Sequence, residues 1–234
     1  MMYEIKFADT KGVDNTYYPK PASAYIPDWF KNTPSYPLNQ SLTEEDVDRY
    51  GDLNNKTIKN CMPVFDAMTT GYIIPTYQDV LFYKNKQGHI LSSWVQHDPV
   101  IEGHHKKQTP FLESNNENGF LKWINPWQIK TPKGISCLFI APLYADNKYF
   151  ECLSGVVDTD VYNLNINFPF KMKDKNFLGL LPAGTPMIQI IPFKRHKWKM
   201  HIVSDLDFEK QRIKLKSKIR NSYKTQFRQL KIYR

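Results

Sequence analysis

Short apolar runs broken by proline or glycine follow one another through most of the chain, and they restrict its fold more than any other feature. ISCLFIAPL (135–143) is almost continuously apolar, which is typical of a strand covered on both faces. QDVLFYKN and HILSSWV flank KQG, a pattern that predicts a hairpin. Helical spacing of apolar residues is scarce before residue 204. We therefore predict a mainly-β core over residues 59–203.

The segment before this core is dense in proline and aromatic residues. YYPKPASAYIPDWFKNTPSYP (17–37) holds five prolines and six aromatic residues. Proline lacks the backbone donor that a central strand needs, so this is not a central strand. We expect residues 1–58 to form an irregular wrap over the core. A proline-rich ligand for an adaptor domain is the alternative interpretation.

The C-terminal segment has a different composition from the rest. Residues 194–234 contain 14 Lys and Arg against three Asp and Glu, whereas residues 1–193 carry a net charge of −2. The basic character therefore belongs to this segment alone. Apolar residues recur there every three or four positions and predict one face of a basic amphipathic helix over 204–234, namely Leu215, Ile219, Tyr223, Phe227 and Leu230.

Length and composition are those of a folded globular protein. With 234 residues and 14% aromatic residues, the chain can bury a sizeable core, and we expect one domain over 1–203 followed by the helix. No apolar stretch is long enough for a membrane span, and no leader is expected at the N-terminus. The widely spaced Cys61, Cys137 and Cys152 predict buried free thiols. We expect a cytoplasmic protein or a component of a phage particle within a host cytoplasm.

Two acidic residues interrupt the apolar pattern at GVVDTDVYNLNINFPF (155–170). Asp158 and Asp160 follow an apolar triplet, and acids are rare in buried strands unless a partner balances their charge. Three interpretations remain open from the residues. The pair could close a tight turn by bonding to its own backbone, form part of a ligand site, or hold a metal.

This motif resembles the strand-turn motif of dUTPase-like proteins. LLPAGTPMIQIIPF and IKTPKGISCLFIAPLY are similar to the next and the preceding motif of that superfamily, and TTGYIIPTYQDVLF to its early strand. The resemblance implies the β-clip fold of dUTPase and dCTP deaminase. GYIIP, NPWQIKTPKG and GVVDTD are also similar to a group of phage and bacterial proteins of unknown function. This second likeness covers most of residues 58–195.

Carried over residue by residue, the resemblance implies a ligand site at Asp158, Asp160, Tyr162 and Gln189. Asp158 matches the position that orients the attacking water, Tyr162 the residue packed on the sugar, and Gln189 the motif glutamine. The chain departs from the family elsewhere. Leu143 and Tyr144 stand where the family has phosphate-binding Arg and Ser, and leucine has no donor for phosphate. The last glycine is Gly184, so the family's glycine-rich arm has no counterpart.

Two further groups of residues are candidates for binding. His97, His104 and His105 lie near Asp98 and Glu102, and imidazole with carboxylate suits Zn or Fe(II), although a solvated loop is the alternative. The predicted helix carries a dense cationic surface that could contact nucleic acid or an acidic protein, made of Lys210, Arg212, Lys214, Lys216, Lys218 and Arg220. The alternative for this helix is packing on its own domain or on another subunit.

From these features we expect a non-catalytic structural or binding protein of phage type that forms a homo-oligomer or joins a larger assembly, without a cofactor. The alternative is a nucleotide-binding or nucleotide-hydrolysing enzyme of dUTPase-like fold with an altered active site. The missing phosphate donors and the missing glycine-rich arm favour the first expectation.

Overall fold

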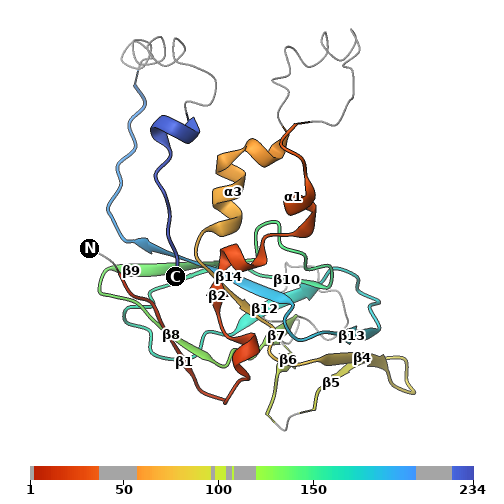
Figure 1. Ribbon diagram of the computed structural model, residues 1–234. Helices are drawn as coiled ribbons and strands as arrows, with labels where there is room; N and C mark the ends of the chain where they lie inside the picture. Colours follow the sequence, from red (N-terminus) through yellow and green to blue (C-terminus); the bar gives the residue numbers. More distant parts are fainter. Residues whose placement is uncertain (1–2, 37–56, 96–97, 104–106, 108–119, 204–222) are drawn as a thin grey trace. The chain divides into compact units, whose positions relative to one another are not determined.

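The computed structural model of the chain describes residues 3–36, 57–95, 98–103, 107, 120–203 and 223–234 (Figure 1). The chain divides into two compact units. The first, here called the β unit, comprises residues 1–27, 68–195 and 233–234, and the second comprises residues 28–67 and 196–232. The mainly-β prediction is confirmed within the described residues. The hairpin predicted from QDVLFYKN and HILSSWV is also confirmed, with strands over 80–84 and 90–93. The single domain expected over residues 1–203 stays a prediction.

The β unit is built from antiparallel sheets (Figure 1). The largest has the strand order β11-β9-β14-β3-β2, a second has the order β10-β12-β7-β6, a third β13-β4-β5, and β1 pairs with β8. The strands are β1 (Lys6–Asp9), β2 (Lys20–Pro21), β3 (Tyr72–Pro75), β4 (Val80–Lys84), β5 (Ile90–Ser93), β6 (Ile101–Gly103), β7 (Leu121–Trp123), β8 (Trp127–Lys130), β9 (Ile135–Ile140), β10 (Phe150–Cys152), β11 (Gly155–Val157), β12 (Phe168–Met172), β13 (Gly179–Leu181) and β14 (Pro186–Lys194).

Two long strands form the centre of the largest sheet. β9 is the apolar run identified in the sequence, and four of its six residues are buried. It pairs with β14 from Ile135↔Lys194 to Ile140↔Gln189, and β14 pairs on its other side with β3. The long register explains why the C-terminal end of β14 reaches the turn before β9. Asp158 and Asp160 lie at this end.

Gly71 allows the chain to enter β3 close to β14. Its φ is 78°, and a Cβ atom at this position would lie 2.0 Å from the carbonyl oxygen of Ile190. Its own carbonyl accepts a hydrogen bond from the backbone N–H of the fully buried Ala22 at 2.9 Å. Only glycine combines this backbone conformation with so close an approach.

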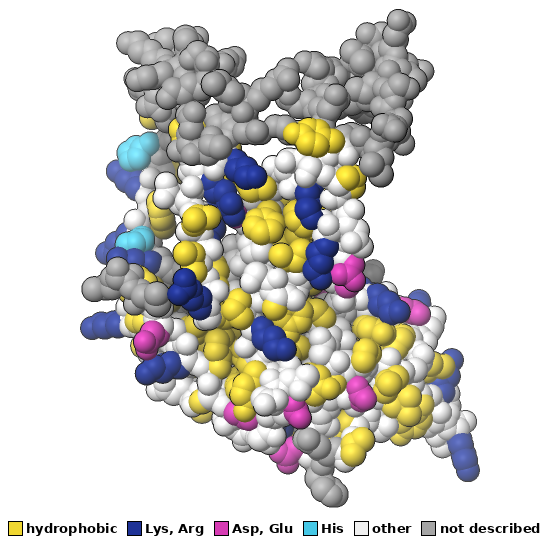
Figure 2. Space-filling model, in the orientation of Figure 1, with side chains coloured by type: hydrophobic (Ala, Val, Ile, Leu, Met, Phe, Trp, Pro, Cys, Tyr) yellow, Lys and Arg dark blue, Asp and Glu magenta, His cyan; other side chains and the backbone are white. Residues whose placement is uncertain are grey.

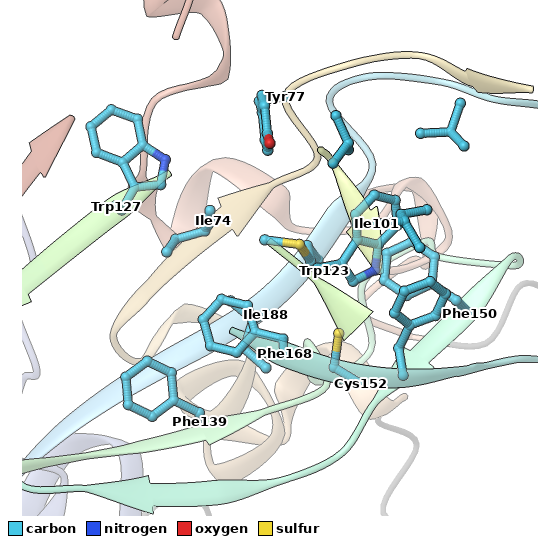
Figure 3. Packing of buried hydrophobic residues seen from close by; sticks show 14 of the residues in the cluster. Ile74, Tyr77, Ile101, Trp123, Trp127, Phe139, Phe150, Cys152, Phe168 and Ile188 are labelled. Carbon is cyan, nitrogen blue, oxygen red and sulfur yellow. The ribbon is translucent and has the colours of Figure 1, made fainter. Parts of the chain in front are cut away.

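Aromatic side chains dominate the core of the β unit (Figure 3). Trp123 stacks on Phe170 with ring centroids 4.8 Å apart, and the ring centroid of Phe150 lies 5.1 Å from that of Trp123.

Cys137 and Cys152 are buried free thiols, as predicted, whereas Cys61 is half-buried. Burial raises the pKa of the Cys137 thiol to about 11, so this thiol stays protonated at neutral pH.

The N-terminal region contributes short elements at sheet edges. Proline lies in β2, the outermost strand of its sheet, where a missing N–H does not interrupt the ladder. The 3-10 helices η1 (Asn15–Tyr17) and η2 (Ala22–Tyr25) connect and follow these strands. Tyr18 and Tyr36 remain 41% and 59% exposed, so the aromatic rings of this region are not buried throughout.

The second unit contains α1 (Asp28–Asn32), η3 (Ile58–Asn60), most of α3 (Met62–Thr69) and the π-helical turn η5 (Tyr223–Phe227). Phe30 and Phe65 stack at 6.0 Å, and Lys59 donates hydrogen bonds to the Phe30 and Lys31 carbonyls. Asp66 binds Arg228 at 2.6 Å and Lys231 at 2.8 Å. These contacts hold residues 228–231 against α3.

The predicted C-terminal helix falls largely outside the described residues, which omit 204–222. Leu215 and Ile219 are therefore not placed, and Tyr223, Phe227 and Leu230 are 46%, 44% and 72% exposed. The docked apolar stripe stays a prediction. No described helix is long and apolar enough to cross a membrane.

Candidate functional site

The acidic motif forms a turn that follows β11. The backbone N–H groups of Val161 and Tyr162 both donate to the Asp158 carbonyl, at 3.0 and 2.9 Å. Thr159 is fully buried, and its hydroxyl lies 2.7 Å from that of Thr131. This is the turn expected as one of the three interpretations.

Arg195, the residue after β14, balances the charge of both aspartates. Its guanidinium donates to the Asp160 carboxylate through both terminal nitrogens, Nη1 at 2.7 Å. Nη1 also lies 3.1 Å from Oδ1 of Asp158. The Ser136 hydroxyl donates to Asp158 at 2.6 Å, and the Gly134 N–H donates to Asp160 at 2.8 Å. The sequence interpretation missed this arginine, although IIPFKR ends in two basic residues after the last strand.

These contacts make both carboxylates weaker bases. The hydrogen bond from Arg195 is the largest cause that lowers the pKa of Asp160, from an ordinary 3.8 to about 2, and the Gly134 N–H adds to it. The Ser136 hydroxyl and then Arg195 lower the pKa of Asp158. A carboxylate that abstracts a proton from water near neutral pH needs a raised pKa. The electrostatics therefore favour a structural role, in which the turn is fastened to the ends of β9 and β14.

The side-chain amide of Gln189 also forms its hydrogen bonds within the β unit. It is fully buried, its Oε1 accepts from the Leu143 N–H at 2.8 Å, and its Nε2 donates to the Thr70 carbonyl at 2.7 Å. Tyr162 is 41% exposed beside the acidic turn. At the position implied for phosphate binding, the Leu143 N–H is thus bonded to Gln189, and Tyr144 adopts a left-handed φ of 63°.

The other predicted binding residues lie outside the described residues. These are His97, His104 and His105 and the basic set Lys210, Arg212, Lys214, Lys216, Lys218 and Arg220. Within the part of the chain that is described, no group of three or more His, Cys, Asp or Glu side chains is placed to hold a metal ion.

An open groove of about 670 Å³ lies between two loops of the β unit, residues 145–149 and 182–186. Asn147 anchors one wall, since its Nδ2 donates to the Pro186 carbonyl and its Oδ1 accepts from the Tyr149 N–H. The Asn147 side chain therefore joins the two loops.

The three-stranded sheet β13-β4-β5 presents an apolar outer surface. Alternate residues of β4 point inward and are buried, Val80 at 0% and Phe82 at 3% exposure. The residues between them point outward and remain exposed, Leu81 at 45% and Tyr83 at 40%. Figure 2 shows hydrophobic side chains gathered over these strands at the lower right.

Cross-strand register makes this surface continuous. Leu180 of β13 lies opposite Leu81, and Leu91 of β5 lies opposite Tyr83. Leu180 is 53% and Leu91 39% exposed. We call Leu81, Tyr83, Leu91 and Leu180 the apolar sheet face. A sheet with one solvated side normally alternates apolar and polar residues, so this face has the composition of a buried surface.

The sequence contained a signal for this face that was not interpreted. VLFY has four apolar residues in succession, and a strand with apolar residues at every position needs cover on both sides. The turn predicts the hairpin, but nothing in the sequence shows that the core covers only one side of it.

Comparison of the chain with protein-family models, with curated proteins and with solved structures yields no match in any of the three.

Proposed function

We propose that the chain is a non-catalytic structural or binding protein that assembles with further copies of itself through the apolar sheet face. The observation that carries the proposal is the four contiguous, outward-pointing apolar side chains on β13, β4 and β5. Contiguous apolar surface on a folded protein marks interaction sites.

Covering this face contributes to the free energy of association. Each side chain is about half exposed, so its full burial contributes roughly 1 kcal/mol, half of the value for a large apolar side chain. Four of them contribute about 4 kcal/mol per face, or about three orders of magnitude in dissociation constant. A contact of this kind is sufficient to specify an oligomer when further surface around it is also covered.

The acidic turn supports the non-catalytic part of the proposal. Asp158 and Asp160 have lowered pKa values and are bound by Arg195, Ser136 and Gly134. Their hydrogen-bonding capacity fastens the turn, which supports a structural role for the motif over water activation.

The test is the native mass of the purified protein, measured by light scattering over a wide dilution series. We expect the unmodified protein to be an oligomer. The double variant Leu81→Ser/Leu91→Ser should be dissociated at concentrations where the unmodified protein stays assembled. Because both side chains point outward, the circular dichroism spectrum should change little.

Leu164→Ser is the matched control. Leu164 is 67% exposed in the β unit but lies outside the apolar sheet face, so its removal should leave the native mass unchanged. A protein that is monomeric throughout the dilution series would refute the proposal, as would equal effects of the control and the double variant.

A further inference from the structure

Residues 196–203, here called the arm, follow β14 as an extended segment (Figure 1). The last described backbone hydrogen bond before the arm is that of the Arg195 N–H to the Gly134 carbonyl, at 2.9 Å. Within the described part of the chain, no hydrogen bond of the arm's own backbone is found. The arm is thus strand-like in conformation but has no described strand beside it.

The arm alternates apolar and basic residues. Trp198, Met200 and Ile202 are 89%, 85% and 92% exposed. Lys197 precedes them, and Lys199 and His201 lie between them. Alternate residues of an extended chain project to opposite sides. One side of the arm therefore carries Trp198, Met200 and Ile202 after His196, and the other carries Lys197, Lys199 and His201 before Val203. A strand that covers an apolar surface has this pattern of one mainly apolar and one mainly polar side.

We infer that the arm of one copy packs its apolar side on the apolar sheet face of another copy. This inference rests on the proposed function and names the segment that covers the face. Both surfaces are apolar and exposed, and every copy supplies both, so no further component is needed to cover them.

The spacing of the two surfaces agrees. Side chains two residues apart on an extended arm are about 6.6 Å apart, and so are Leu81 and Tyr83 along β4. Neighbouring apolar residues of the arm therefore have the same separation as the two cross-strand rows, Leu180–Leu81 and Tyr83–Leu91. In this arrangement the arm's lysines face the solvent and require no acidic partner.

A nucleic acid explains fewer of the arm's features. Stacking on Trp198 and phosphate contacts to Lys197 and Lys199 would account for three residues. Met200 and Ile202 would remain in water, although they are as exposed as the tryptophan. The sheet face accounts for all three apolar residues, so a second copy is the favoured partner.

A mixing experiment tests the inference directly. An arm variant, Trp198→Ser/Met200→Ser/Ile202→Ser, keeps an intact face, and the face variant Leu81→Ser/Leu91→Ser keeps an intact arm. We expect each variant alone to associate about 100-fold more weakly than the unmodified protein. Mixing the two should restore association as a one-to-one complex, because one intact arm then meets one intact face.

Two control variants separate the alternatives. Lys197→Gln/Lys199→Gln alters only the basic side and should remain assembled. Leu230→Ser/Ile232→Ser removes exposed apolar residues outside the arm, 72% and 66% exposed, and should also remain assembled. Loss of assembly in the lysine variant, together with retention of a single-stranded oligonucleotide by the unmodified protein, would overturn the inference in favour of nucleic acid.

The other outcomes distinguish the two proposals. If the face variant dissociates and the arm variant does not, the proposed function stands and the arm is not the covering segment. If neither variant changes the native mass, both proposals fail. If both dissociate but their mixture does not associate, the arm–face contact between copies is refuted.

A photo-crosslinker at position 198 provides a second test. In a mixture of light and heavy-isotope protein it should join light to heavy chains, and crosslinks confined within single chains would also refute the arm–face contact between copies.

Discussion

Substitution of Gly71 by alanine should destabilise the β unit strongly, and Gly88→Ala provides a matched comparison. Both glycines have a left-handed backbone, with φ of 78° and 84°. A residue with a side chain in this conformation costs about 1–2 kcal/mol. At Gly88 the added Cβ meets nothing within 4 Å, so this conformational cost is the whole effect.

At Gly71 a second cost arises from the approach to β14. The added Cβ would lie 2.0 Å from the Ile190 carbonyl oxygen, far inside van der Waals contact, so β3 and β14 must move apart. The movement disturbs the 2.9 Å hydrogen bond from the buried Ala22 N–H to the Gly71 carbonyl. An unsatisfied buried backbone group costs about 1–3 kcal/mol. Together with the conformational cost, we expect a loss of about 2–5 kcal/mol.

Thermal unfolding followed by tryptophan fluorescence measures the difference, since Trp123 and Trp127 are buried in the β unit. In a protein of this size 1 kcal/mol corresponds to about 2–4 °C in Tm. We expect Gly88→Ala to lower Tm by a few degrees and Gly71→Ala by roughly twice as much or more. Equal shifts for the two variants would refute the argument that the close approach of β3 to β14 requires glycine.

Two further substitutions test the ion pairs. Arg195→Gln should raise the pKa of Asp160 from its lowered value of about 2. A carboxylate with a lowered pKa stabilises the fold above its ordinary pKa and loses this contribution as the pH falls through its folded value, so the deficit in Tm should be largest at neutral pH and narrow towards pH 2. Asp66→Asn should release Arg228 and Lys231, whose contacts lower the pKa of Asp66, and trypsin should then cleave after both residues faster.

The contradicting outcomes are specific to each pair. A deficit in Tm for Arg195→Gln that stays constant from pH 7 down to pH 2 would show that the charge of Asp160 does not contribute. For Asp66→Asn the matched control is Asp28→Asn, because the Asp28 carboxylate is 80% exposed in its pair with Lys31. Equal rates of tryptic cleavage in these two variants would refute the role of Asp66 in holding residues 228–231.

Local pattern was sufficient for the strands and insufficient for the partners of polar residues. ISCLFIAPL predicts β9 because a short run of consecutive apolar residues is typical of a strand buried on both faces. The acidic turn was one of the open interpretations of Asp158 and Asp160. Its partner Arg195 lies 35 residues further along, and only the register of β14 on β9 brings the two together. Gln189 is a ligand-site candidate through the resemblance of its motif alone. Its burial depends on the same register of β14 on β9, which local pattern does not contain.

The amino-acid sequence by itself determined the mainly-β class, the hairpin of β4 and β5, the buried thiols of Cys137 and Cys152, and the basic C-terminal charge. These properties depend on neighbouring residues and on composition. Tertiary structure alone decided which face of β4 is covered, which cation balances the aspartates, and that Trp198, Met200 and Ile202 are exposed. The physical reason is that exposure and charge pairing depend on what packs against a residue, and those neighbours come from distant parts of the chain.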